Sequence, residues 1–213
     1  MSVLRGAIVA IGLATGLGAS AAQSPGAGGD TLIDVLVWGP LSSVDVTVYA
    51  PDVRAALERL LRRAQSYRSQ RPVPKGSREE PMIHGAQVRY ERLLVAFADD
   101  PQARAAAVSY VDRLRPCYEW EGFHDCPERE ALFAIEYLNA NPSGPFSEFL
   151  PLLAAHRWLC AAEGYGDEKR PADAARSRRA YESALATARL STDVLVRAAA
   201  AALGARGRCR AGS

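Results

Sequence analysis

From Pro51 onward, apolar residues recur every three or four positions, and this spacing constrains the fold more than any other feature of the chain. In the first such segment, Val53, Leu57 and Leu60 share one face of a helix, while charged residues occupy the other face. This period is that of an amphipathic α-helix with its apolar face against a core. It returns in later segments that proline, glycine and short polar loops separate, so about seven helices are expected. Short connections favour antiparallel neighbours, and the sequence predicts an all-α bundle or a short helical array.

Several of these helices begin at recognisable capping residues. Asp100 stands directly before a proline, and Ser191 precedes the last Ala-rich segment, so each is expected to be an N-cap. The helix that begins near Pro127 carries Glu128 and Glu130 in its first turn, where carboxylates complement the helix dipole. Its later residues are apolar nearly all round, which predicts that it is the most buried helix.

Residues 30–51 show a different pattern. Two β-branched runs, TLIDVLVWG and VDVTVYAP, flank the Pro/Ser turn PLSS, and apolar residues alternate with polar ones in the second run. Such runs are typical of strands. The sequence therefore predicts a small N-terminal β-hairpin or extended arm, which has to lie against the helices because a lone hairpin is marginally stable in water.

The first 22 residues have the layout of a cleavable secretory signal. Arg5 is followed by an apolar run and then by small residues before Gln23. The run is shorter and richer in glycine than a membrane span requires, so no integral membrane segment is expected after cleavage. The predicted location is periplasmic or secreted. The predicted organisation is a signal peptide (1–22), a flexible lead-in (23–29), a single helical domain (30–209) and a tail (210–213).

The chain has four cysteines, Cys117, Cys126, Cys160 and Cys209. An even number in an exported chain favours two disulfides over metal ligation. Three pairings are possible, and the preferred one joins Cys117 to Cys126 across a short loop and therefore Cys160 to Cys209. No pair has the CxxC spacing of a zinc site, so neither a metal nor another cofactor is predicted. His156, four residues before Cys160, is expected to be a hydrogen-bonded core histidine rather than a ligand.

The segment 116–127, PCYEWEGFHDCP, holds the best candidates for catalysis. Glu119, Glu121 and Asp125 are weak candidates for the paired carboxylates of a glycosidase, one protonated beside an aromatic ring and the other ionised. His124 and Asp125, with a carboxylate four residues after the histidine, also have the residue types of a divalent metal site. The preferred alternative is that His124 or Asp125 caps the following helix.

The same segment is a candidate binding surface. Tyr118, Trp120 and Phe123, together with His124, would form a rigid contact patch if the disulfide loop displays them. Aromatic side chains offer a large contact area at a small entropic cost. In the alternative, which the sequence favours about equally, the rings fold inward against the helical core.

Charge is unevenly distributed along the chain. Residues 116–168 are mainly acidic, and the residues from Lys169 onward are mainly basic. Attraction between these two segments within the fold is preferred over two separate binding faces. The basic segment lacks interleaved aromatic residues, and the chain is expected to be exported, so nucleic acid is not a predicted partner.

In residues 151–190, aromatic and small residues stand at spacings that resemble one helical hairpin of the tetratricopeptide repeat family. The first-helix positions are Trp158, Ala162 and Tyr165, and the second-helix pair is Tyr181 with Ala184. The resemblance covers less than a quarter of the chain. It implies stacked helical pairs whose concave surface binds peptides or proteins.

The sequence contains no phosphate loop, dinucleotide fingerprint, HExxH zinc motif or GxSxG elbow. Export, disulfides and helical architecture favour a protein or peptide interaction module of the cell envelope over an enzyme. Its expected partner is another protein or a peptide in the envelope. The alternative function is a cell-wall glycan hydrolase that uses the carboxylates of the 117–126 loop.

Overall fold

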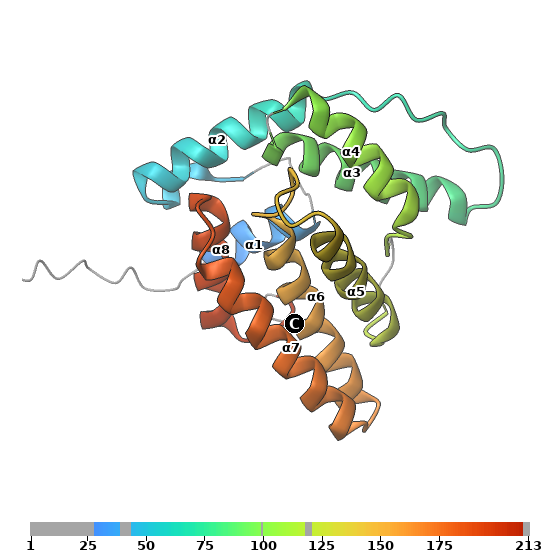
Figure 1. Ribbon diagram of the computed structural model, residues 1–213, viewed down its shortest axis with the longest axis vertical. Coiled ribbons are helices and arrows are strands. Elements are labelled where there is room, and N and C mark those ends of the chain that lie inside the picture. Colours follow the sequence, from blue (N-terminus) through green and yellow to red (C-terminus); the bar gives the residue numbers. More distant parts are fainter. Residues whose placement is uncertain (1–27, 39–43, 99, 118–120, 211–213) are drawn as a thin grey trace, which may run out of the picture.

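The computed structural model describes residues 28–38, 44–98, 100–117 and 121–210 (Figure 1). These residues form eight α-helices and one 3-10 turn, with no strand among them. The predicted all-α fold is confirmed, with one helix more than expected. The elements are α1 (Gly28–Trp38), η1 (Val46–Val48), α2 (Pro51–Ser66), α3 (Glu79–Ala98), α4 (Pro101–Arg113), α5 (Asp125–Ala140), α6 (Leu150–Asp167), α7 (Pro171–Arg189) and α8 (Val194–Arg206).

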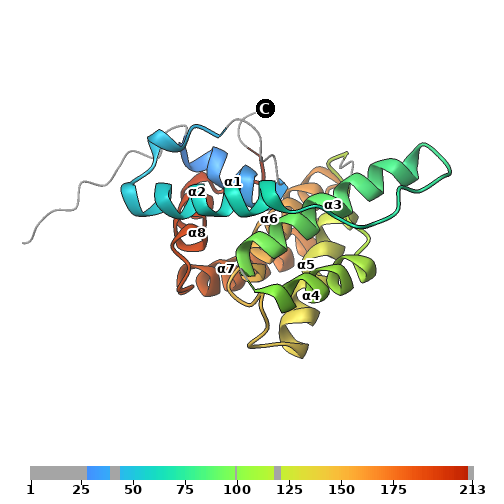
Figure 2. The ribbon, with the colours of Figure 1, turned by 90° about the horizontal axis from the view of Figure 1, so that it is seen from above.

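The helices form two groups, α2 to α4 and α5 to α8 with α1, and α2 connects the first group to α8 of the second. Helix α6 packs most extensively against α7 and next against α5, while α8 packs against α7 and α1. Helix α3 pairs with α4, and α2 contacts both α3 and α8. Figure 1 shows α2, α3 and α4 across the upper part of the view with α6 and α7 extending below, and Figure 2 shows them from above. None of the helices in the described part of the chain is long and apolar enough to cross a membrane.

Helix α6 is the most buried helix, because it has neighbours on several sides. Almost every residue from Leu150 to Tyr165 is buried, including the polar His156 and Arg157. The expectation that the helix beginning near Pro127 is the most buried one is wrong. That helix, α5, buries mainly the face toward α6, and its Leu132 is 46% exposed.

The N-caps agree with the sequence at one helix and differ at another. The Asp100 carboxylate accepts a hydrogen bond from a first-turn backbone N–H of α4 at 2.9 Å, as predicted. Helix α8 is capped by Asp193, whose carboxylate accepts from two first-turn N–H groups, and not by Ser191. The Ser191 hydroxyl instead accepts from the backbone N–H of Asp193 at 3.1 Å. The chain therefore enters α8 two residues later than the sequence indicated.

The N-terminal region is helical where the structure describes it. The first β-branched run lies in α1, and the second contains only the turn η1. Residues 39–43, which contain the turn of the predicted hairpin, lie outside the described residues, as do residues 1–27, so the hairpin as a unit is not tested. A short apolar run that is buried on more than one side suits a helix as well as a strand. The buried residues of α1 are Leu32, Ile33, Val35, Leu36 and Val37.

Aromatic side chains join the α3–α4 pair to the rest of the core. The Tyr110 ring of α4 lies edge-on to Phe133 and Tyr137 of α5, with ring centroids 4.9 and 5.1 Å away. Phe97 of α3 stacks on Phe149, just before α6, at 4.5 Å. Such pairs contribute about 0.5–1.5 kcal/mol beyond the burial of their area. They hold α3 and α4 in a fixed position relative to α5 and α6.

Both predicted disulfides are present. Cys117 and Cys126, with Cα atoms 6.0 Å apart, close the loop before α5. Cys160 and Cys209, with Cα atoms 4.8 Å apart, join α6 to the short segment after α8. The loop-closure estimate gives the longer-range bridge about 4 kcal/mol and the shorter one about 3 kcal/mol, because the cost of closing a loop grows with its length.

Candidate functional site

The structure describes only part of the cysteine loop that the sequence singled out. Tyr118, Glu119 and Trp120 lie outside the described residues. Of the other candidates, Glu121 and Asp125 are exposed and the Phe123 side chain is 55% exposed. His124 is half-buried, and its surroundings show what holds the loop in place.

His124 occupies the N-cap position of α5, one of the two positions predicted, but its side chain makes no capping hydrogen bond. The side chain binds the end of α6 instead. The Nδ1 atom of His124 lies 2.6 Å from Oε1 of Glu168, and the imidazole stacks on the Tyr165 ring with centroids 4.0 Å apart. The residue therefore ties the disulfide loop to the C-terminal end of α6.

A glycine of α6 makes room for this loop. A Cβ atom added at Gly164 would lie 2.6 Å from the backbone N of His124 and 2.8 Å from the carbonyl carbon of Phe123. Real Cβ atoms do not approach backbone atoms so closely, and a backbone cannot swing away as a flexible side chain does. The loop rests directly on the helix backbone at Gly164.

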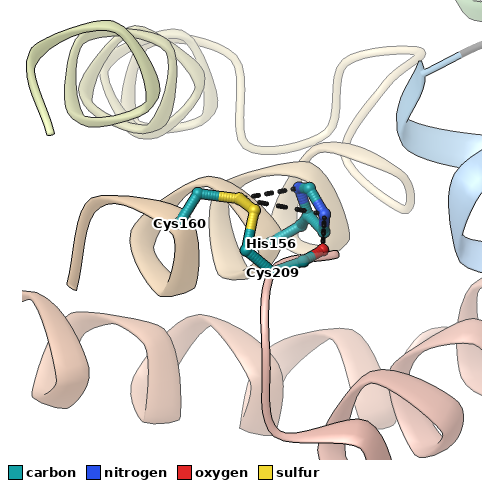
Figure 3. A group of neighbouring side chains, drawn as sticks. All are labelled: His156, Cys160 and Cys209. Carbon is teal, nitrogen blue, oxygen red and sulfur yellow. Dashed lines mark hydrogen bonds between the residues drawn. A yellow bond between two sulfur atoms is a disulfide. The ribbon is translucent and has the colours of Figure 1, made fainter. Parts of the chain in front are cut away.

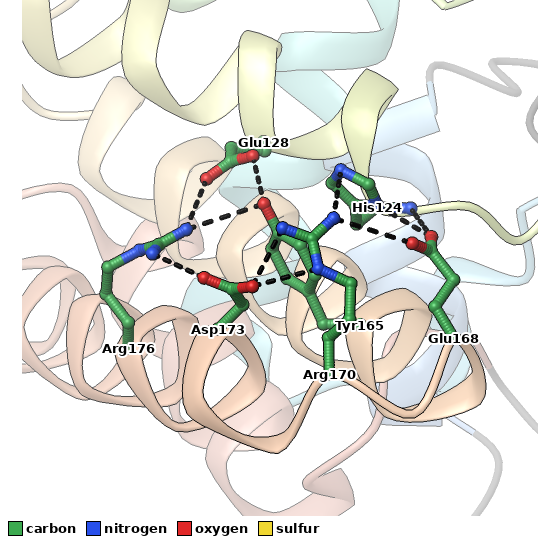
Figure 4. Close-up of polar contacts among 7 residues, drawn as sticks. All are labelled: His124, Glu128, Tyr165, Glu168, Arg170, Asp173 and Arg176. Carbon is green, nitrogen blue, oxygen red and sulfur yellow. Dashed lines mark hydrogen bonds and ion pairs between the residues drawn. The ribbon is translucent and has the colours of Figure 1, made fainter.

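The contact of His124 continues into a surface network along the α6–α7 turn (Figure 4). The Tyr165 hydroxyl donates to Glu128 of α5 at 2.5 Å, and an Arg176 guanidinium nitrogen lies 3.3 Å from the same carboxylate. Arg170 lies over the Tyr165 ring, 4.5 Å from its centroid, and pairs with Asp173 at 2.7 Å. Acids from before residue 169 thus pair with bases after it, as the charge distribution predicts. We call this set of seven residues the loop brace: His124, Glu128, Tyr165, Glu168, Arg170, Asp173 and Arg176.

The brace stabilises charged carboxylates and a neutral phenol. The hydrogen bond from His124 lowers the pKa of Glu168. Burial, together with the hydrogen bond to Glu128, raises the pKa of Tyr165 to about 12. Each carboxylate of the brace faces an arginine, a histidine or a phenol, so the described part of the loop has the contacts of a structural anchor.

A second polar network is buried beneath the brace and was not predicted. The Arg157 guanidinium pairs with Glu130 of α5, and another of its nitrogens donates to the Tyr90 hydroxyl of α3 at 2.6 Å. Glu130 also accepts from the Tyr90 hydroxyl at 2.8 Å and from the backbone N–H of Cys117 at 2.7 Å. Burial and the Glu130 carboxylate act on the pKa of Arg157 in opposite senses, and the net effect raises it. This network joins α3, α5 and α6.

His156 is a hydrogen-bonded core histidine, as predicted. Its ring is fully buried, and Nε2 lies 2.9 Å from the backbone carbonyl oxygen of Cys209. Burial lowers the pKa of His156 well below its usual range, and the neighbouring Arg157 and Arg206 act in the same sense. The ring is therefore neutral at physiological pH.

Two hollows lie away from the cysteine loop, along α2, α3 and α4. A hollow of about 520 Å³ is lined by Arg63, Ser66, Tyr67, Val95, Asp100, Pro101 and Arg104. A second hollow of about 360 Å³ is lined by Tyr67, Arg68, Gln70, Arg71, Pro72, Glu91, Arg104, Val108 and Asp112. Tyr67 and Arg104 line both, so the two hollows adjoin. We call them together the α2–α4 groove.

The acids of the groove already have partners. Glu91 accepts from the Tyr67 hydroxyl and pairs with Arg71, which also pairs with Asp112 at 2.5 Å. Burial and the Glu91 carboxylate raise the pKa of Tyr67, so its hydroxyl remains a donor. These contacts fix the chain between α2 and α3 along one side of the groove.

The centre of the groove is an arginine on an aromatic ring. Arg104 lies over the Tyr67 ring, 5.1 Å from its centroid, and no carboxylate of the described residues lies within ion-pair distance of Arg104 or Arg68. Asp100 lines the first hollow, but its carboxylate caps α4. The groove therefore presents positive charge beside the apolar surfaces of Val95 and Pro101.

A comparison with protein families, curated proteins and solved structures found no match for this chain. Residues 151–190 do contain a packed pair of helices, α6 and α7. Such a pair occurs in many all-α folds, so the tetratricopeptide resemblance stays a prediction.

Sequence reasoning missed the groove and found the loop. The cysteines and aromatic residues of the loop are conspicuous because they are adjacent in sequence. Groove residues come from three helices and a connecting segment, and only the Pro- and Arg-rich stretch after Ser69 marked them. Arg71 stands directly before Pro72 and Arg68 four residues before it, but this pattern does not indicate which helices lie opposite.

Proposed function

We propose that this chain is an exported binding module that holds an acidic peptide segment of a protein partner in the α2–α4 groove. The observation that carries the proposal is the shared position of Tyr67 and Arg104 at the centre of two adjoining hollows. Arg104 lies on an aromatic ring and has no carboxylate of the described residues within ion-pair distance, so it is suited to receive one from a ligand.

The shape and lining of the groove support a peptide rather than a small anion. The two hollows have volumes of about 520 and 360 Å³, in the range of sites that hold several side chains. Val95, Pro101 and Pro72 provide apolar contact on either side of the arginines. A peptide with an acidic residue between apolar ones matches this order of surfaces.

Export to the cell envelope is part of the proposal. Two disulfides fit an oxidising compartment, because cytosolic thiols are usually kept reduced. The signal-like residues 1–22 point the same way. The periplasm or the extracellular medium is therefore the place where the partner is expected.

The cysteine loop gives less support to the alternative of a glycan hydrolase. Glu121 and Asp125 are exposed, and neither lines the groove. A glycosidase needs two carboxyl groups that flank one bound sugar linkage. The Phe123 ring is exposed, which supports the loop as a second surface for a protein partner.

A selection from random peptides displayed on phage tests the groove. We expect enriched peptides to carry Asp or Glu, and their affinity to fall about tenfold or more in the Arg104→Glu variant, because a repulsive charge replaces an attractive one. Arg179→Glu is the matched control, since Arg179 is exposed on α7 and the same charge change there should leave binding intact. Equal affinity of Arg104→Glu and wild type, or enrichment of peptides without acids, contradicts the proposal.

A further inference from the structure

Three potential ligand atoms of a soft metal ion meet in the core between α6 and the segment after α8. His156 and Cys160 are four residues apart on α6, which places them on one face of the helix. Cys209 completes the group, and one ligand atom from each residue lies within 4.8 Å of the others (Figure 3). All three residues are fully buried.

The imidazole has the orientation of a metal-ligating histidine. Its Nε2 atom lies 2.9 Å from the carbonyl oxygen of Cys209, while Nδ1 lies 3.6 Å from Sγ of Cys160. Histidines that bind metals usually donate one ring N–H to a carbonyl or carboxylate and offer the other nitrogen to the ion. Here Nε2 would be the fixed donor and Nδ1 the ligand.

We propose that reduction of the Cys160–Cys209 disulfide creates a site for one Cu(I) ion, with both thiolates and His156 Nδ1 as ligands. A small dithiol supplies two electrons and two protons, the S–S bond breaks, and the dithiol becomes a cyclic disulfide. Binding of the ion then releases one proton from each cysteine. The oxidised chain does not bind, because both sulfur atoms are used in the disulfide.

The distances require little movement. Metal–sulfur and metal–nitrogen bonds in protein sites are about 2.0–2.3 Å, so two ligand atoms on opposite sides of one ion are about 4.0–4.6 Å apart. The three atoms start from within 4.8 Å. Cys209 follows the end of α8 instead of lying within a helix, so its sulfur has room to adjust once the disulfide opens.

The ligand set and its surroundings favour monovalent copper over zinc. Thiolates select soft ions such as Cu(I), whereas structural zinc is almost always bound by four ligands, and this group offers three. Cu(I) with two thiolates carries a net negative charge, and guanidinium groups lie close by. Arg206 donates to the Cys209 carbonyl oxygen at 2.6 Å, and Arg157 lies 3.3 Å from His156 Nδ1. Arg157 has to give up this last contact, but it keeps Glu130 and Tyr90 as partners.

A Cu(I) titration tests the site, with bicinchoninate as the coloured competitor and oxygen excluded. The protein is the full chain with Cys117→Ser and Cys126→Ser, so that only the Cys160–Cys209 pair can be reduced. We expect the reduced protein to take one equivalent of Cu(I) and the oxidised protein none. His156→Gln should weaken binding at least tenfold, and His84→Gln, which changes a half-buried histidine of α3, should leave it unchanged.

Three results would overturn the proposal. They are no uptake by the reduced protein, equal uptake by the oxidised protein, and equal affinity of His156→Gln and His84→Gln. If reduction lowers the helical circular dichroism signal, Cu(I) has to restore it, and failure to do so counts against the site as well. If His156→Gln does not fold, X-ray absorption of the copper-loaded parent protein decides, since sulfur-only coordination contradicts the histidine ligand.

Discussion

Glu128 and Glu130 lie two residues apart on α5, and each binds an arginine and a tyrosine, but in opposite environments. Glu128 belongs to the loop brace, where its partner Arg176 is 53% exposed. Glu130 is 1% exposed and its partner Arg157 is 2% exposed. The same combination of residue types therefore anchors α5 at two places, one at the surface and one in the core.

The two sites should differ in how much stability is lost when one partner of the ion pair is removed. A solvated ion pair adds little to stability, because salt screens its charges and water hydrates the remaining partner when the other is removed. A buried pair has already lost its hydration, so the surviving charge has no replacement for its partner. Removal of one partner should therefore cost much more stability in the buried network than in the brace, although the brace has more members.

The largest effect is expected from Glu130→Gln. This change leaves the Arg157 charge buried without a carboxylate, and it should lower the free energy of unfolding by about 3–5 kcal/mol. Glu128→Gln, the same change two residues earlier on α5, should cost far less. Urea unfolding of the two variants measures the difference, and equal losses would show that burial does not separate the two pairs.

The double variant Glu130→Gln with Arg157→Met separates charge from packing. Removal of both charges leaves no unpaired ion in the core, so this protein should be more stable than Glu130→Gln alone. A double variant that is less stable than the single one would mean that the hydrogen bonds that Arg157 donates to the Tyr90 hydroxyl and the Val37 carbonyl oxygen matter more than the unpaired charge.

An intermediate effect is expected from Gly164→Ala, where the loop that carries His124 of the brace contacts α6. The new methyl group would press on the backbone of His124 and Phe123, and the loop would have to leave its seat on α6. We expect a loss of about 1–3 kcal/mol, as for other overpacked sites. Gly166→Ala is the control, because a Cβ atom there meets nothing within 4 Å and the change should stabilise α6 slightly.

A Gly164→Ala protein as stable as the Gly166→Ala protein would contradict the close seat of the loop. The hydrogen bond between His124 and Glu168 provides a second readout. Its loss should shift the imidazole resonances of His124 in nuclear magnetic resonance spectra, while those of His156 stay in place. A shift at both histidines would mean that α6 itself has been distorted.

Much of the fold follows from the sequence, because local signals specify it. The helical period predicted α2 to α8, and the even cysteine number with one short loop predicted both disulfides. The run at residues 31–39 predicts a strand, because β-branched residues and a nearby turn favour strands. Residues 31–38 of this run belong to α1, which packs against α8, and contacts of this kind join residues that are distant in sequence.

The candidate sites were less predictable, because they depend on which residues become neighbours. Glu130 was read as a helix-dipole partner, yet it falls in phase with the small residues Ala131 and Ala134 that face α6. Arg157 stands inside the apolar run LPLLAAHRWLCAA, and a charge in such a run requires a buried partner. These two signals were present, but only the packing of α5 on α6 joins them.

The smallest effect is expected from Glu168→Gln, and it should depend on pH. Because the hydrogen bond from His124 lowers the pKa of Glu168, the carboxylate stabilises the fold above its usual pKa of 4.5 and loses this contribution as the pH falls below it. The variant should melt slightly lower than wild type at neutral pH and close to wild type in acid. Asp167→Asn is the control, since this neighbouring acid is exposed. A melting difference that persists unchanged to low pH would show that Glu168 stabilises the fold through packing and not through its charge. Close packing, as at Gly164, would then account for the stability of the brace.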